Sequence, residues 1–363
     1  MLYNLLVPYA DKIGWLRLFS YITFRAAYAT VTSFLIAFIL GPIIIRWLKK
    51  LHLRAAIRDE VPERHRLEKG SIPSMGGVII LLCIVVPTLL WADLTNKYIL
   101  ITLGVTILMG GLGFLDDYIK VVKRKPLGLM GRFKLIWQFS AALCVGVFLY
   151  VFPMDDGETT RIVVPYLKEG FLQLGVLYIL FVGIVIVGSS NAVNITDGLD
   201  GLACGSVAIA TIAYAIFIYV AGNVKMANYL DVLYVPEVGE LTIFAMAMLG
   251  AVLGFLWFNS YPAQVFMGDT GSLSLGSAIG AMAVMAKQEL LLVVVGGVFV
   301  IEILSVVLQV GYFKLTGGKR IFKMAPIHHH FELSGWAESK VTVRFWILSA
   351  IFALIAISSL KIR

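Results

Sequence analysis

Charged residues are scarce in this sequence. Only 14% of its 363 residues are Asp, Glu, Lys or Arg, against roughly 25% in a soluble globular protein, and 60% are hydrophobic. So few charges cannot cover a water-exposed surface, which argues against a soluble enzyme and favours an integral membrane protein. The formal net charge of +8 would suggest nucleic acid in a soluble protein. In a membrane protein it indicates cationic loops and an anionic substrate, so we expect no nucleic-acid partner.

Cysteine is also rare. Cys83, Cys144 and Cys204 each lie within an apolar run, so we expect each to be a small buried hydrophobic residue. Their spacing fits neither a metal site nor a disulfide framework. A cleavable signal peptide is not evident either, because residues 1–20 mix charged and apolar residues, as a short segment at the membrane interface would.

Long apolar stretches, by contrast, are abundant. A membrane helix needs about 20 mainly apolar residues, and ten stretches meet or approach this length. They lie at 26–46, 73–92, 98–115, 135–152, 171–190, 202–221, 241–258, 270–286, 290–313 and 343–360. The sequence therefore predicts an all-α, polytopic membrane protein with about ten transmembrane helices, as a single domain spanning residues 1–363.

The distribution of Lys and Arg predicts the orientation. Three connections, 46–72, 118–134 and 314–344, hold 20 of the 30 basic residues. All three follow odd-numbered spans, so they lie on one side of the membrane, and the positive-inside rule makes that side cytoplasmic. Both termini are then expected to be periplasmic.

Two adjacent carboxylates, Asp116 and Asp117, end the third predicted span. They could be solvated residues at a helix end, but carboxylates there oppose the helix dipole and repel each other. A functional role is therefore the favoured interpretation, because paired carboxylates suit cation binding or proton transfer.

Polar residues are also concentrated in two further connections on the same side. NAVNITDGLDG at 191–201 contains four amide or carboxylate side chains spaced by three, which a turn alone does not explain. NSYPAQVFMGDTGS at 259–272 contains Gly268 and Gly271, which would let the backbone approach a ligand. Its Asp269 could cap the following helix, bind a ligand, or do both.

Three histidines, His328, His329 and His330, lie in the last basic connection. A metal site is one interpretation, but we favour hydrogen bonds to a phosphate or sugar, since Mg²⁺ prefers oxygen ligands. Within the ninth span, Glu302 and Gln309 share a helix face, where a structural interhelical hydrogen bond and a functional role explain them equally well.

One more string, KGSIPSMGG, precedes the second span. Its Lys69 and Ser74 offer a cation and a hydroxyl that suit an anionic ligand. The aspartates at 116, 117, 197, 200 and 269 and the three histidines all fall on the predicted cytoplasmic side, whereas independent solvated loops would scatter carboxylates over both faces. This convergence predicts an active site at the cytoplasmic helix ends.

At these residues the sequence resembles a known superfamily, the polyprenyl-phosphate N-acetylhexosamine-1-phosphate transferases. DDY, NAVNITDGLDGLA and FMGDTGS resemble the superfamily signatures, while PIHHHFE and KGSIPSMGG resemble those of its phospho-N-acetylmuramoyl-pentapeptide translocase family. The resemblance covers essentially the whole chain. It implies Mg²⁺-dependent transfer of phospho-MurNAc-pentapeptide from UDP-MurNAc-pentapeptide to undecaprenyl phosphate in the bacterial inner membrane. The products would be lipid I and UMP, in the first membrane step of peptidoglycan synthesis, and the enzyme would be a homodimer.

The resemblance also implies residue roles. Asp269 would bind the metal, and Asp116 would act as the base with Asp117 beside it. The residues that would shape the nucleotide and diphosphate site are Asn191, Asn194, Asp197, Asp200, Asn259, Phe266, Gln309, His328, His329 and His330. The sequence leaves open whether the lipid phosphate attacks directly or an aspartate attacks first, and which aspartate is the base.

Two alternatives remain. A transferase of GlcNAc-1-phosphate would share the aspartates, although PIHHHFE argues against it. A lipid or solute transporter would place its polar site near the midplane, usually within internal repeats, whereas here the carboxylates gather at one face and no repeat is visible.

Overall fold

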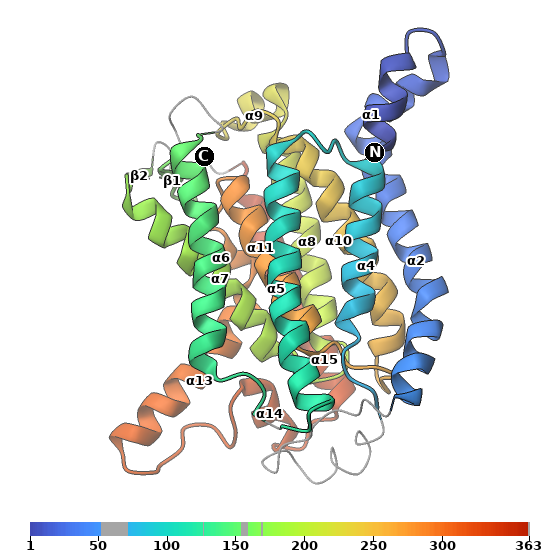
Figure 1. Cartoon of the computed structure of the whole chain (residues 1–363). Coiled ribbons are helices and arrows are strands. Elements are labelled where there is room, and N and C mark those ends of the chain that lie inside the picture. The colour runs from blue at the N-terminus through green and yellow to red at the C-terminus, as the bar shows by residue number, and fades with distance from the viewer. Residues whose placement is uncertain (52–71, 126, 154–158, 168–169, 362–363) are drawn as a thin grey trace.

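The computed structural model describes residues 1–51, 72–125, 127–153, 159–167 and 170–361. These residues form a helical bundle with a small two-stranded antiparallel sheet at one end (Figure 1). The elements are α1 (Leu2–Leu6), η1 (Val7–Tyr9), η2 (Gly14–Ser20), α2 (Ile22–Lys50), α4 (Gly77–Trp91), α5 (Lys97–Val121), α6 (Gly131–Val151), β1 (Arg161–Val163), β2 (Phe171–Gln173), α7 (Leu177–Thr196), α8 (Leu202–Ala221), α9 (Val224–Leu230), η3 (Val238–Glu240), α10 (Leu241–Asn259), α11 (Gly268–Met285), α12 (Leu292–Val295), α13 (Gly297–Leu315), α14 (Ile327–Glu332) and α15 (Glu338–Ser358).

Eight helices are long and apolar enough to cross a membrane, counted over the described residues. They are α2, α5, α6, α7, α8, α10, α13 and α15, with η3 joined to α10. The other two predicted spans are helices too. However, α4 has only 15 residues, and the 18 residues of α11 include many Gly and Ser. The all-helical membrane architecture is confirmed, while the count of ten crossings stays a prediction.

The centre of the bundle is built on α8, α10 and α11. Every residue of α11 from Thr270 to Met285 is buried, and α11 packs against α4, α5, α7 and α8. Small residues make this possible, because without bulky side chains the backbones of neighbouring membrane helices can approach closely. Helix α11 is therefore a buried central helix and not a lipid-facing one.

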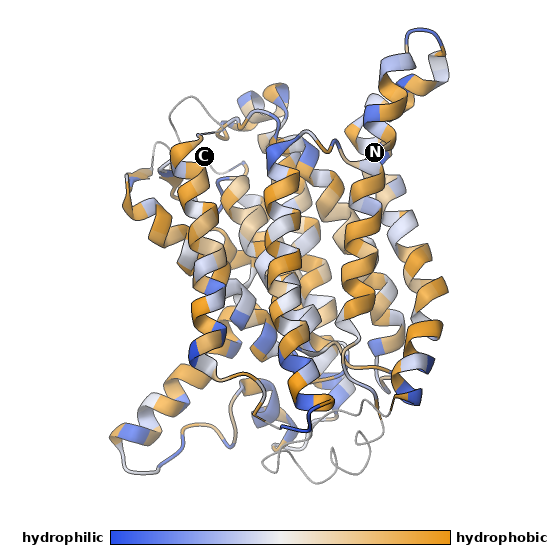
Figure 2. Cartoon of the chain, in the orientation of Figure 1, coloured by the Kyte–Doolittle hydropathy of each residue, from blue (hydrophilic) through white to orange (hydrophobic). Residues whose placement is uncertain are grey.

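Polar residues lie mainly at the two ends of the bundle, with apolar residues between them (Figure 2). Both termini lie at one end, as an even number of crossings requires, and α14 lies at the other (Figure 1). The connections after α5 and α13, which carry many of the basic residues, are at the α14 end.

Three details differ from the sequence-based expectations. Cys83 and Cys204 are buried as expected, but Cys144 is exposed on α6, because an apolar residue of a membrane helix can face lipid instead of protein. The predicted span 290–313 is interrupted at Gly296, between α12 and α13. The predicted span 171–190 begins later and continues to Thr196, so NAVNIT is the end of a helix rather than a connection.

Candidate functional site

Asp116 and Asp117 lie inside α5, about one turn before its end, and both are buried. The predicted span ended at residue 115, but the helix continues to Val121. The continuation places Lys120 one turn beyond Asp116, where residues four apart share a helix face. Lys120 Nζ lies 2.5 Å from Asp116 Oδ2.

Asp116 is held from two further directions. The backbone N–H of Leu129 donates to Asp116 Oδ1 at 2.6 Å, and Lys134 Nζ of α6 lies 3.5 Å from Asp116 Oδ2. The connection passes close above the carboxylate at Gly128, whose φ is +62° and where a Cβ would crowd Asp116 Oδ1. The turn between α5 and α6 thus depends on a glycine to bring Leu129 and Lys134 to this aspartate.

Asp269, in the first turn of α11, shares the same two cations. Lys120 Nζ donates to Asp269 Oδ2 at 3.0 Å, and Lys134 Nζ also donates to that oxygen. The other oxygen, Oδ1, accepts from Asn194 Nδ2 at 2.9 Å. Side chains from α5, α6, α7 and α11 therefore form one cluster of two carboxylates, two ammonium groups and a carboxamide, which we call the Asp–Lys cluster (Asp116, Lys120, Lys134, Asn194 and Asp269).

Asp117 has a different environment. Its Oδ1 accepts from the backbone N–H of Asp269 at 3.1 Å, and its Oδ2 accepts from the N–H and hydroxyl of Thr270 at 2.9 and 2.7 Å. These are free donors at the start of α11, so Asp117 caps that helix from α5. The carboxylate faces the positive end of the α11 dipole, which stabilises its charge.

Glycines bring α11 this close. A Cβ on Gly113 of α5 would collide with the backbone of Asp269, and one on Gly77 of α4 would collide with the backbone of Gly271. Gly268 has φ of +71°, and a Cβ there would crowd the Asp117 carboxylate. The start of α11, with Asp269 on it, is therefore fixed by backbone contacts to two neighbouring helices.

The connections after α7 and α10 lie beside each other. Asn259 Oδ1 accepts from Gly201 N at 3.1 Å, and Asp200 Oδ2 accepts from Ala263 N at 2.9 Å. The backbone of Phe266 accepts from Gly76 N at 2.8 Å and donates to Pro73 O at 2.9 Å, next to the buried Ser74. Polar strings that lie about 60 to 190 residues apart in the sequence are thus joined by hydrogen bonds.

Asn191, on the last turns of α7, donates to Gln138 Oε1 of α6 at 2.8 Å and to the carbonyl of Val187. Asp197 is half-buried just beyond the end of α7. Lys69 lies outside the described residues.

The three histidines occupy α14 and point to three different partners. The fully buried His328 places Nδ1 3.0 Å from Glu302 Oε2 of α13. His329 Nδ1 is 2.8 Å from Glu332 Oε2, and His330 Nδ1 accepts from the backbone N–H of Lys323 at 3.1 Å.

Gln309 also forms hydrogen bonds with the backbone of the segment before α14. Its Oε1 accepts from the N–H groups of Ile321 and Phe322, each at 3.0 Å, and its Nε2 donates to Phe322 O at 3.1 Å. These bonds attach that segment to α13.

Lys120 and Lys134 were counted in the sequence only as basic loop residues, and their place in the site was missed. A signal existed for Lys120, which is four residues after Asp116 on a helix that could extend past the predicted span. For Lys134 the sequence holds no comparable signal, because its approach depends on the turn through Gly128.

The donor set of the Asp–Lys cluster fits Mg²⁺. This ion is usually held by one or two carboxylates together with substrate phosphates and water, and Asp116, Asp269 and the carboxamide of Asn194 offer such oxygens. A metal cage made by protein alone is not evident, since among the described residues no group of three or more His, Cys, Asp or Glu could hold a metal ion.

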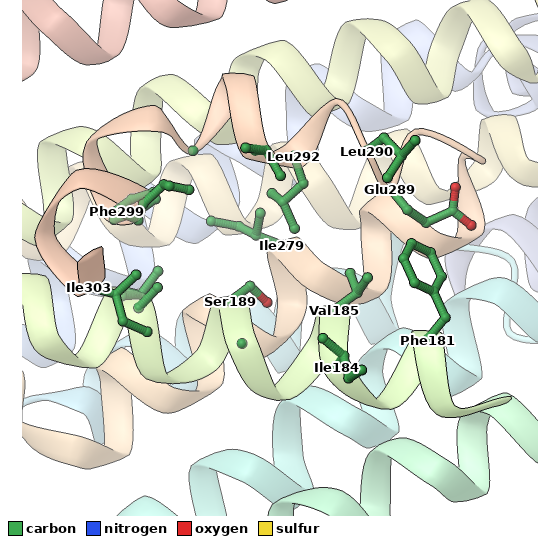
Figure 3. A pocket seen from close by; sticks show the side chains of 16 residues that line it. Phe181, Ile184, Val185, Ser189, Ile279, Glu289, Leu290, Leu292, Phe299 and Ile303 are labelled. Carbon is green, nitrogen blue, oxygen red and sulfur yellow. The ribbon is translucent and has the colours of Figure 1, made fainter. Parts of the chain in front are cut away.

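An apolar cavity of about 300 Å³ lies between α7, α11, α12 and α13. Phe181, Ile184, Val185 and Ser189 border it from α7, opposite Leu292, Phe299 and Ile303 (Figure 3). Ala192 and Val193 also line it. These two residues lie at the same level of α7 as Asn191 and Asn194, so the cavity extends along α7 to the level of the site, on a different helix face.

Comparison with known proteins gives consistent results. Residues 99–287 match the model of a family described as glycosyl transferase family 4. The chain is 56% identical over 363 residues to the phospho-N-acetylmuramoyl-pentapeptide-transferase of Citrifermentans bemidjiense and 53% identical over 363 residues to that of Thermodesulfovibrio yellowstonii, with 100% of each chain covered. A relative of the same name from a Geobacter species is 56% identical over the same length.

Proposed function

The chain belongs to glycosyl transferase family 4, and from this premise we propose that it transfers phospho-MurNAc-pentapeptide from UDP-MurNAc-pentapeptide to undecaprenyl phosphate, giving lipid I and UMP. The structural observation that carries the proposal is the Asp–Lys cluster. Two carboxylates share two ammonium groups there, next to helix ends rich in amide and carboxylate side chains. The site is then on the cytoplasmic side of the bacterial inner membrane, within one membrane domain.

The reaction brings two anions together, a lipid phosphate and the diphosphate of a nucleotide sugar. Lys120 and Lys134 would offset their repulsion by donating to phosphate oxygens that enter the cluster, in which both ammonium groups now pair with carboxylates. When bound, Mg²⁺ would supply further charge neutralisation for the leaving UMP. Asp269 would hold it, with Asp116 and Asn194 beside it.

The partners of the two adjacent aspartates favour Asp116 as the proton acceptor. Asp117 accepts three hydrogen bonds from the start of α11, so its oxygens are committed to holding that helix. Asp116 faces the two lysines instead, on the side where phosphates would gather. In this role Asp116 takes the proton from the lipid phosphate, and the phosphate oxygen attacks the β-phosphorus of the UDP-sugar as UMP leaves.

The remaining polar residues have places in the same proposal. Asn191, Asp197, Asp200, Asn259, Phe266, Gly268, Gln309, the three histidines, Lys69 and Ser74 would shape the nucleotide-sugar site. The polyprenyl chain would enter the apolar cavity beside α7, which extends along that helix to the level of Asn191 and Asn194. The resemblance to the translocase family further supports a homodimer.

One assay tests the function. Purified protein in detergent, given UDP-MurNAc-pentapeptide, undecaprenyl phosphate and Mg²⁺, should release UMP and form a lipid-linked product. Chelation should stop the release, and UDP-GlcNAc should not replace the substrate. Release of UMP from UDP-GlcNAc alone would contradict the substrate assignment.

Asp269→Asn is the first variant for this assay. Asparagine keeps the shape of the aspartate side chain and can still accept the hydrogen bond from Asn194. It removes the negative charge that would hold Mg²⁺. Loss of one such charge group typically lowers the rate by about 10²-fold or more. A wild-type rate with unchanged Mg²⁺ dependence would refute the proposed role of Asp269.

A further inference from the structure

The short connection between α7 and α8, residues Asp197–Gly201, is held by the C-terminal part of the chain. We call it the α7–α8 loop. Its Asp197 and Asp200 belong to the proposed nucleotide-sugar site, whereas the elements that hold it, α13, α14 and α15, lie about 100 residues or more further along.

Helix α15 binds the loop backbone with three side chains spaced by four residues. Glu338 Oε1 accepts from Asp200 N at 2.9 Å, and Thr342 Oγ1 donates to Asp200 O at 3.3 Å. Trp346 Nε1 donates to Gly201 O at 3.2 Å. Because residues four apart lie on one helix face, α15 presents a single face to the loop.

Helix α14 supports the loop at Gly198. The imidazole of His328 is fully buried there, and a Cβ on Gly198 would collide with its Nε2. The other ring nitrogen, Nδ1, faces Glu302 Oε2 at 3.0 Å. This contact with Glu302 fixes the orientation of the ring.

Apolar packing joins the same three elements independently. A second core cluster contains Leu199 of the loop with Leu202, Val298, Val341 and Phe345. Ile327 and Phe331 of α14 pack against this cluster. The α7–α8 loop therefore contacts α14 through His328 and through the packing of Leu199. Its backbone is hydrogen-bonded to side chains of α15.

We propose that Glu302, His328 and Glu338 are positioning residues that fix the α7–α8 loop, and that they set the affinity for the nucleotide sugar more than the rate of phosphate transfer. The proposal rests on the proposed function, since it takes that loop as part of the substrate site. The Asp–Lys cluster is held by other elements, α5, α6, α7 and α11. A displaced loop should therefore raise KM while kcat changes less. His328 then acts through the loop and not by contacting a phosphate.

A size-exchange experiment at Gly198 and His328 tests this contact. Gly198→Ala should raise KM for UDP-MurNAc-pentapeptide at least about tenfold, because overpacking a tight contact displaces the backbone. His328→Asn keeps a hydrogen-bond donor near Glu302 but replaces the imidazole with a shorter carboxamide. It therefore leaves room at Gly198 for the new methyl group. The double variant should then have a lower KM than the Gly198→Ala variant, as coupled neighbours do.

The outcomes separate positioning from direct binding. A double variant whose KM equals or exceeds the product of the two single effects would overturn the proposal, as would Glu302→Gln or Glu338→Gln lowering kcat with KM unchanged. Ser305→Ala is the matched control on α13, because it removes a buried hydroxyl that, among the described residues, donates to Glu302 O within the same helix turn. Its KM should match the wild type.

Thermal unfolding in detergent measures the same coupling without any substrate. The midpoint should fall for Gly198→Ala and recover in the double variant, and additive losses would refute the contact. Wild-type UMP release in the same preparation tests the proposed function separately, so a failure of one conclusion is distinguishable from a failure of the other.

Discussion

Asp116 and Asp117 are consecutive residues of α5, yet their carboxylates bind different neighbours. Successive side chains on a helix point about 100° apart, so one faces Lys120 and Lys134 and the other faces the start of α11. Repulsion between them is therefore smaller than their adjacency suggests, because each is paired with positive charge or with N–H donors.

A pH profile tests the role assigned to Asp116. Asp116→Asn should lower the rate of UMP release most at low pH, where the lipid phosphate keeps its proton, by up to about 10²- to 10⁴-fold, the usual contribution of a general base. Part of the loss should be recovered as pH rises, because the second pKa of a phosphate monoester is about 6 and its dianion needs no base. Rates measured from pH 6 to 9 give the profile.

Two results would count against this role. A covalent nucleophile at Asp116 would allow labelled UMP to exchange into the UDP-sugar without any lipid acceptor, and Asp116→Asn would abolish that exchange. Asp117→Asn is the neighbouring control. It should reduce stability through the lost cap of α11, and its residual activity should not recover with pH.

Single residues show how far the sequence could lead. Asp116 and Asp269 could be predicted to share a site, because both strings fall on one side of the membrane. The approach of Lys134 could not be predicted, since it depends on how the α5–α6 turn folds over Asp116 at Gly128, whereas the four-residue spacing from Asp116 was a signal for Lys120. The sequence predicts that His328 faces a ligand. Its contacts with Glu302 and Gly198 could not be predicted, because both residues are distant from it in the sequence.

At the scale of elements, apolar stretches predicted nearly every long helix but not its ends. α7 continues through Thr196 although Asn191 and Asn194 look like turn residues, because both find partners on α6 and α11. The sequence of α11 is only weakly typical of a membrane span. Its Gly and Ser residues lower its hydrophobicity, yet they let it pack at the centre of the bundle.

The contact of α5 with α11 gives a prediction about such packing. Gly113→Ala should destabilise the protein by about 1–3 kcal/mol, because the new methyl group meets the backbone of Asp269 and neither helix can move away easily. It should also lower activity by displacing that aspartate. The thermal midpoint and the rate of UMP release are the two measurements.

Gly111 on the same helix is the matched control. It is exposed, and a Cβ there would meet nothing within 4 Å. Gly111→Ala should leave activity unchanged and stabilise α5 by about 0.5–1 kcal/mol, the usual gain when alanine replaces glycine in a helix. Equal losses in the two variants would show that the α5–α11 contact is not as close as described.

At the scale of the whole molecule, two observations are consistent with one orientation of the chain in the membrane. The Lys and Arg count predicts that the connections after α5 and α13 are cytoplasmic. In the structure these connections lie at the end of the bundle that holds α14, and both termini lie at the opposite end with β1 and β2 (Figure 1). A site at the α14 end meets both substrate requirements, since the lipid tail stays among the helices while the nucleotide sugar comes from the cytoplasm.

Labelling of single cysteines tests this orientation. Cys83, Cys144 and Cys204 are first replaced, since the exposed Cys144 would itself react. In that background, Lys125→Cys and Ala325→Cys should react with a membrane-impermeant maleimide only after the cytoplasmic side is opened, and so should a cysteine at position 60, which lies outside the described residues. Thr160→Cys, next to β1, should react in intact spheroplasts. Each variant must retain UMP release, so that only folded protein is scored. Reaction of Ala325→Cys from the periplasm would place α14 and the Asp–Lys cluster on the side where no nucleotide sugar is available. That result would overturn the orientation and, with it, the proposed access of substrate to the site.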